Sequence, residues 1–248
     1  MRHDLSPLLT DFDYEPGRLK ARIVRAADGR EVLQVRVELG LLQMECEGRP
    51  DGRGSVLAEA EAFLDRLRNG AAEARDGDAA DSALGGGALA AALRLELIQY
   101  QQRAVAFLAV GDSARALRDA EVVRMGTATV ARLGGPAERE WSESARFSAV
   151  VLRTRAAAAM LAAAGRPREA GSVIETGLAM LREAAVFVGI DEHFDTLADV
   201  RSLRALRDTL VPQLPPAQRS ELEERLRAAV RAENYELAAI LRDELRLL

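Results

Sequence analysis

The first fifth of the chain shows the alternation of apolar and polar residues that is typical of β-strands. The apolar positions with a period of two are Leu33, Val35, Val37 and Leu39, followed after Gly40 by Leu42, Met44 and Cys46. The change of phase at Gly40 requires either a β-bulge there or a two-residue turn that has Gly40 as its first residue. In the second case Leu39 lies opposite Leu42. Two pairs further on, Val37 lies opposite Met44.

A further strand is predicted over residues 19–25, ahead of these two. The connection, residues 27–30, contains Asp28-Gly29, a dipeptide that favours hairpin turns because it tolerates positive φ. Residues 1–54 therefore predict a small antiparallel sheet of two or three strands. Such a sheet can expose only one face to water, so we expect helices to cover the other face.

From Ser55 onward the apolar residues recur at helical spacing, and Ser55 itself is a suitable N-cap. The predicted fold class is mainly α with a small N-terminal antiparallel β-sheet (α+β). We expect a helical body over residues 55–212, interrupted by a flexible linker at about residues 76–87. The run Gly85-Gly86-Gly87 suggests that linker.

Two breaks in the helical body resemble each other. Gly111 and Gly165 each follow a small residue by seven positions and precede an alanine by five. These offsets resemble those of the tetratricopeptide repeat (TPR), in which small residues let two antiparallel helices approach and glycine makes the turn. The glycines are 54 positions apart rather than the 34 of that repeat. A TPR-like body over residues 88–188 and a generic alanine-rich bundle are both compatible with this pattern.

Residues 213–248 predict a helical hairpin. Pro215-Pro216 stands where proline is tolerated at a helix start, residues 231–233 make the turn, and Asn234 is placed to cap the second helix. The two helices carry matching apolar stripes, but Ile240 and Leu247 project away from them. The stripe of the first helix is Leu222, Leu226, Ala229 and Val230, and that of the second is Leu237, Ala238, Leu241, Leu245 and Leu248. Two helices of this length are only marginally stable on their own. The exposed apolar positions therefore predict that a third surface, from this chain or another, covers them.

The hairpin also resembles a known family. The run Glu233-Asn234-Tyr235-Glu236-Leu237-Ala238-Ala239, followed by Leu241-Arg242-Asp243, is similar to the UVR motif of the excision-repair proteins UvrB and UvrC. Tyr235 stands where that family commonly has phenylalanine. The resemblance implies that the hairpin binds a partner protein or a second copy of itself. The expected contact residues are Tyr235, Ala239, Ile240, Leu241, Arg242, Asp243 and Leu247.

Composition narrows the class of protein. The net charge is −5 and only 4% of residues are aromatic, which disfavours nucleic-acid binding. The single cysteine, Cys46, fits a reducing cytoplasm. No apolar run is long enough for a membrane span, and the N-terminus lacks a signal-peptide pattern. Lys20 is the only lysine beside many arginines and alanines, which indicates the codon bias of a GC-rich genome. Residues 39–45 and 48–52 resemble the opening of bacterial UVR-motif proteins, which implies a bacterial source.

Candidate chemistry elsewhere is sparse. Arg49, Arg53 and Ser55, ahead of a predicted helix N-terminus, could hold an anion, but a plain connecting turn is the preferred explanation. The carboxylates around His193 are better explained as a helix-capping segment than as metal ligands. Cys46 falls on the apolar side of its strand, so we expect it to be buried. With no catalytic group and no cofactor motif, the sequence predicts a non-enzymatic adaptor. The alternative is a regulatory domain that senses a ligand or anion through the Arg49/Arg53 loop or the concave helical face.

Overall fold

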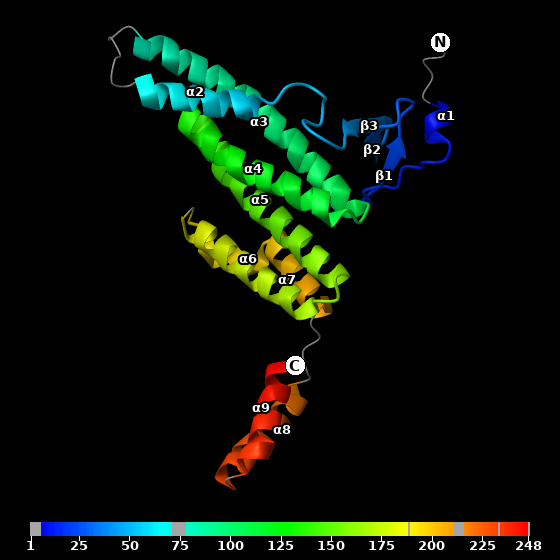
Figure 1. Ribbon diagram of the computed structural model, residues 1–248, viewed down its shortest axis with the longest axis vertical. Coiled ribbons are helices and arrows are strands. Elements are labelled where there is room, and N and C mark those ends of the chain that lie inside the picture. The colour runs from blue at the N-terminus through cyan, green and yellow to red at the C-terminus, as the bar shows by residue number, and fades with distance from the viewer. Residues whose placement is uncertain (1–5, 71–77, 188, 211–215, 233, 248) are drawn as a thin grey trace.

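The computed structural model describes residues 6–70, 78–187, 189–210, 216–232 and 234–247. After a short helix α1 (Ser6–Leu9), the N-terminal region forms an antiparallel sheet of β1 (Ala21–Arg25), β2 (Glu31–Val37) and β3 (Gly40–Glu45) in the order β1-β2-β3. Helices make up the rest of the described chain (Figure 1). The predicted fold class, mainly α with a small antiparallel sheet, is confirmed.

The hairpin between β2 and β3 turns two residues earlier than predicted. Val37 pairs with Gly40, so Glu38 and Leu39 form the turn. Leu42 therefore lies opposite Val35, not opposite Leu39. A shift of two residues keeps the same side chains on the buried face, which is why the alternation alone did not distinguish the registers. Leu39 is left at the tip with 92% of its surface exposed.

A guanidinium group holds this turn in place. Arg36 donates hydrogen bonds from Nη1 to the carbonyl oxygens of Val37 and Gly40, the second over 2.7 Å. Its Nε donates to the carbonyl oxygen of Phe12 over 2.7 Å. One side chain thus satisfies carbonyl groups at the turn and in the N-terminal segment, a long-range contribution that alternating patterns do not reveal.

Both faces of the central strand β2 are covered. Leu33 and Val35 pack with Met44 and Cys46 against helices, as expected for one face. On the opposite face the buried Gln34 accepts a hydrogen bond from Arg22 Nε (2.9 Å). The Arg22 guanidinium in turn lies 4.3 Å from the centre of the Phe12 ring. The N-terminal segment therefore covers the face that the sequence left open to water.

Six longer helices follow in the described part of the chain up to residue 210, and each packs against the next one along the sequence. Their bounds are α2 (Val56–Gly70), α3 (Asp78–Ala109), α4 (Ser113–Leu133), α5 (Pro136–Ala163), α6 (Pro167–Phe187) and α7 (Ala198–Leu210), with a short 3-10 helix, η1 (Asp191–Thr196), before α7. The sheet packs on α3 at one end of this layered body (Figure 1). The capping prediction for Ser55 is confirmed, because its Oγ accepts a hydrogen bond from the Ala58 N–H.

The triple glycine is helical rather than a linker. Gly85, Gly86 and Gly87 lie inside α3, and of the predicted linker only residues 76–77 fall outside the described residues. A Cβ on Gly86 would lie 3.4 Å from the Leu133 carbonyl oxygen, and Gly85 faces the ring of Phe63. The glycines therefore let α3 approach α2 and α4 closely, a role that composition cannot distinguish from flexibility.

The two similar breaks are built alike. Gly111 adopts φ +81° and Gly165 φ +71°, a conformation that favours glycine. In each case the next residue donates its N–H to a carbonyl five residues back, from Asp112 to Phe107 and from Arg166 to Leu161, both over 2.9 Å. Each is a helix-ending Schellman motif. The small residues around them are buried at the helix contacts: Ala104, Ala116, Ala158 and Ala170. The turns fit the TPR-like pattern, while membership of that repeat family stays a prediction.

Glycine also sets the distance between helices at two buried positions. A Cβ on Gly177 of α6 would overlap the Thr154 side chain, and one on Gly126 of α4 would overlap the Leu97 side chain. A Cβ on Gly87, in contrast, would meet none of the described packing neighbours within 4 Å. The same substitution should therefore have opposite effects at these sites.

We expect Gly177→Ala to lower the free energy of unfolding by about 1–3 kcal/mol, because the methyl group forces α5 and α6 apart. Gly87→Ala should raise it by about 0.5–1 kcal/mol, since alanine loses less backbone entropy in a helix. Urea unfolding of both variants tests this pair. Equal effects at the two positions would contradict the packing described here.

A buried ion pair links the sheet to two helices. Arg103 of α3 donates to both carboxylate oxygens of Asp119 in α4, from Nε (2.6 Å) and Nη2 (2.8 Å), and both side chains are at most 1% exposed. Its Nη1 donates to the carbonyl oxygen of Glu45, at the end of β3, over 2.6 Å. Arg118 adds a hydrogen bond to the Cys46 carbonyl oxygen over 2.7 Å. The junction between sheet and helices is therefore held by paired polar groups.

Asp119→Ala should lower the free energy of unfolding by about 3–5 kcal/mol, because it leaves the Arg103 guanidinium buried without its anion. Asp65→Ala is the matched control. It removes an exposed ion pair with Arg68 on α2 and should change stability by less than about 0.5 kcal/mol. Thermal and urea unfolding of both variants measures the difference, and a loss for Asp119→Ala no larger than that of the control would rule out the structural role.

Candidate interaction surface of the C-terminal hairpin

The last part of the chain forms the predicted hairpin, from α8 (Pro216–Arg231) and α9 (Tyr235–Leu247). Asn234 caps α9 as expected, since its Oδ1 accepts a hydrogen bond from the Leu237 N–H over 3.1 Å. The backbone N–H of Asn234 donates to the Ala229 carbonyl oxygen over 2.9 Å and closes the turn. Figure 1 shows the hairpin as a separate pair of helices beyond α7.

The hairpin has a small core of its own. Its buried members are Leu222, Ala229, Ala238 and Leu241, with Leu226 partly buried beside them. None of these residues belongs to the clusters that form the interior of the body. The described side chains of the hairpin are therefore stabilised by the two helices packing against each other.

Several apolar side chains of the hairpin stay outside this core. The exposed fractions are 70% for Tyr235, 59% for Ile240, 51% for Val230 and 40% for Leu237. Ile240 was predicted to project away from the stripe. Val230 and Leu237 were predicted to lie within the stripes and are more exposed than that, because two short helices shelter only the line of residues directly between them.

The residues of α9 outside the core form two exposed ridges, whereas Val230 lies on α8. Tyr235, Ala239 and Arg242 are spaced by four and three residues, so they share one helix face. Leu237 and Ile240 lie on the other side of the buried pair Ala238 and Leu241. Ala239 is half-buried and Arg242 is exposed. Of the residues that the UVR resemblance implied, Tyr235, Ala239 and Arg242 therefore share a face, which is separate from that of Ile240.

Three expected contact residues need separate comment. Leu241 is only 2% exposed and fills the centre of the hairpin core, so it supports the surface rather than forming it. The apolar stripe of the second helix predicted this buried position, whereas the expected contact set placed Leu241 at the surface. The side chains of Asp243 and Leu247 lie outside the described residues, and their part in the surface stays a prediction.

The anion site expected at Arg49, Arg53 and Ser55 is filled by the chain itself. The carboxylate of Glu96, which is 0% exposed, accepts hydrogen bonds from the Val56 N–H (2.6 Å) and the Ser55 hydroxyl (3.2 Å) at the start of α2. Glu96 comes from the middle of α3, far away in sequence, so local spacing gave no sign of it.

The two arginines of this loop also lie beside carboxylates of the chain. Arg49 Nε lies 2.9 Å from an Asp51 carboxylate oxygen, and its Nη1 lies 3.7 Å from Glu96. Arg53 lies 3.8 Å from Asp51 and has 79% of its side chain exposed. Burial by itself would raise the pKa of Asp51, but hydrogen bonds from the Arg53 N–H and from Gln99, with the nearby guanidinium groups, hold that pKa below its ordinary value. The loop is an internally neutralised connection, as the simpler interpretation held.

Cys46 and the segment around His193 contribute to packing and ion pairs within the chain. Cys46 is 1% exposed, and burial raises the pKa of its thiol, which disfavours the thiolate. In the segment around His193, Phe194 is buried and Asp195 pairs with Arg204 over 2.5 Å. Among the described residues no group of three or more His, Cys, Asp or Glu side chains is arranged to hold a metal ion.

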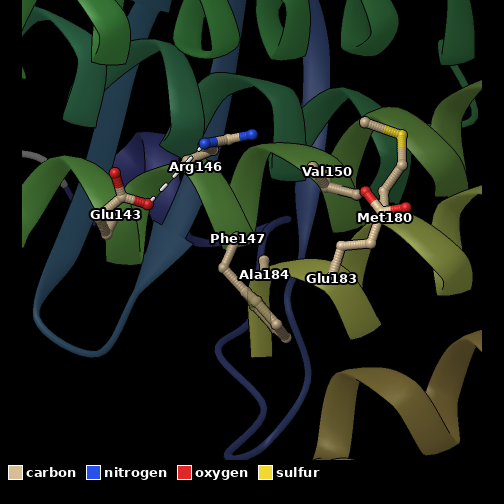
Figure 2. Close-up of a pocket in the computed structure, with 7 residues that line it drawn as sticks. All are labelled: Glu143, Arg146, Phe147, Val150, Met180, Glu183 and Ala184. Atoms are coloured by element: carbon tan, nitrogen blue, oxygen red, sulfur yellow. Dashed lines mark ion pairs between the residues drawn. The ribbon is translucent and has the colours of Figure 1, made fainter. Parts of the chain in front are cut away.

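A surface depression that the sequence did not reveal lies between α5 and α6. It has a volume of about 230 Å³, and Figure 2 shows Phe147 and Arg146 from α5 and Met180 and Glu183 from α6 around it. Helical periodicity places such residues at a helix contact, but it cannot show that the two helices diverge enough there to leave a hollow.

Comparison with known proteins identifies one part of the chain. Residues 217–248 match the UvrB/uvrC motif, UVR, so the C-terminal hairpin carries this interaction motif, as the sequence resemblance predicted. The match leaves residues 1–216 unassigned. No curated protein and no solved structure matches the chain significantly. Within the part of the chain that the structure covers, none of the helices combines the length and apolarity that crossing a membrane demands.

The exposed and buried members of α9 should respond differently to substitution. Leu241→Asp places a carboxylate in the hairpin core, and we expect it to unfold α8 and α9 while the body stays folded. Ile240→Asp should leave the hairpin folded, because that side chain already faces solvent. Hydrogen exchange followed by mass spectrometry over residues 216–247 distinguishes the two, and strong protection of the hairpin in Leu241→Asp would show that the core is assigned wrongly.

Proposed function

We propose that the protein is a non-enzymatic adaptor of the bacterial cytoplasm whose C-terminal hairpin docks onto a partner protein or a second copy of the chain. One observation supports this most directly: a UVR interaction motif folds on its own small core and leaves Ile240, Leu237 and Tyr235 exposed. Exposed apolar side chains concentrated on a short segment are typical of protein interfaces. The body then serves as a scaffold that carries the hairpin.

The mechanism is burial of helix faces against another protein. Ile240 and Tyr235 would supply apolar and aromatic contact area, and exposed charges such as Glu236 and Arg242 would surround it. Such charges steer approach and set register more than they add affinity. The absence of a recognisable catalytic constellation in the sequence is consistent with this role.

The alternative function, sensing of a ligand or anion, is weakened in one of its two forms. Arg49 already forms ion pairs with Asp51 and with the buried Glu96, so an external anion at this arginine would have to displace a carboxylate. The other form, which uses the helical faces of the body, has no observation in its favour beyond the depression beside Phe147.

Ile240→Glu should weaken hairpin-dependent association by about ten- to a hundredfold, because a charge replaces an apolar anchor at the interface. Association is measured by sedimentation velocity of the full chain and by quantitative affinity capture from the native organism. Leu95→Glu is the matched control, since Leu95 on α3 is 62% exposed against 59% for Ile240.

The control should associate like the original chain. Hydrogen exchange on each variant verifies that the hairpin remains folded. If Ile240→Glu and Leu95→Glu leave association equally unchanged while the hairpin is intact, the exposed ridges of α9 are not the docking surface.

A further inference from the structure

The depression beside Phe147 continues into a longer groove. A second hollow of about 530 Å³ adjoins it and shares Glu143, Phe147 and Ala184 with the first. The groove runs from α5 and α6 to the segment before α7. Its apolar lining residues are Phe147, Val150, Met180, Ile190 and Leu197. Met180 and Ile190 are each 37% exposed, so the floor offers apolar surface to an occupant.

The rim of this groove is acidic. Glu140, Glu143, Glu183 and Asp199 line it, and among the described lining residues the one basic side chain is Arg146, which lies 4.0 Å from Glu143. Figure 2 shows the Glu143 and Arg146 pair on α5 and Glu183 across from it on α6. An apolar floor with a net negative rim fits a helix that has an apolar anchor flanked by cationic side chains.

The end of α8 has this chemistry. Residues 225–232 contain three arginines and no acidic residue, in a chain whose net charge is −5. Val230 is 51% exposed, and Arg227 and Arg231 on either side of it in sequence are exposed as well. Val230 lies outside the hairpin core, and its face differs from the α9 ridges that include Ile240 and Tyr235.

We infer that the basic end of α8 from a second copy of the chain docks into the groove between α5 and α6. Val230 contacts Phe147 and Met180, while Arg227 and Arg231 meet the acidic rim. Because each copy carries both the groove and the basic helix end, two copies make the contact twice around a two-fold axis and close as a dimer. The inference rests on the proposed docking role of the hairpin and names the surface that receives it.

Charge reversal on each side, alone and together, tests the pairing. Sedimentation velocity of the full chain should show a monomer–dimer equilibrium that weakens as salt is raised, since the rim charges are exposed. Glu140→Arg with Glu183→Arg should weaken the dimer about tenfold or more, and so should Arg227→Glu with Arg231→Glu. Combining all four substitutions should restore most of the affinity.

Glu59→Arg with Glu61→Arg, at exposed positions of α2 away from the groove, is the matched control and should leave the dimer unchanged. A dimer that is insensitive to the groove substitutions but lost in Ile240→Glu would overturn this inference and retain the proposed function. A chain that is monomeric at all concentrations and salt conditions would also overturn it.

Cross-linking identifies which copy supplies the helix. Cysteines introduced as Val230→Cys and Ala184→Cys can be joined by a short bismaleimide, while the native Cys46 is 1% exposed and should not react. A covalent dimer supports the inference. A cross-link within a single chain would mean that the groove receives the chain's own hairpin, and no cross-link would mean that α8 does not reach the groove; either result overturns docking by a second copy.

Discussion

A buried guanidinium group holds the N-terminal sheet in one arrangement against the helices α3 and α4. Arg103 directs its donors to the Asp119 carboxylate in α4 and to the Glu45 carbonyl oxygen at the end of β3, and its charged group lies 4.9 Å from the Tyr100 ring centre. A charge removed from water is tolerated only with its partners in place. The sheet, α3 and α4 must therefore meet in this geometry or leave polar groups unpaired, whereas purely apolar packing would accept several neighbouring arrangements.

The same helix face of α3 organises the loop before α2. Glu96 stands seven residues before Arg103, two helical turns away, and binds the N-terminus of α2. Gln99, between them, donates to Asp51 over 3.4 Å. The carboxylate of Glu96 satisfies helix N–H groups that a bound anion would otherwise occupy. The polar side chains Glu96, Gln99 and Arg103 on one face of α3 thus position α2, the loop and the sheet. As a consequence, the Val56 N–H at the start of α2 is already occupied by Glu96 and does not face a bound anion.

The sequence predicted what depends on neighbours along the chain. The Asp28-Gly29 turn, the helix-ending glycines and the Asn234 cap all follow from local rules and were correct. The errors occurred where side-chain contacts that the apolar pattern does not report decide the structure. Arg36 fixes the β2–β3 turn through carbonyls that alternation does not report, α3 continues through the triple glycine because Phe63 and Leu133 pack there, and Glu96 fills the loop. For the hairpin, the apolar stripes predicted the exposure of Ile240 and the buried position of Leu241, but not the exposure of Val230 and Leu237.

The division of the chain into a body and a hairpin has an energetic consequence. The body is stabilised by buried pairs and close helix contacts, whereas the described core of the hairpin consists of a few small and medium apolar side chains. Two helices of this length have little stability to spare. Any surface that covers Ile240 or Val230 adds apolar burial to the folded hairpin and therefore stabilises it as it binds. Under the proposed docking role, binding and local folding would be coupled at this end of the chain, so substitutions in the hairpin core would change affinity for a partner without changing the stability of the body.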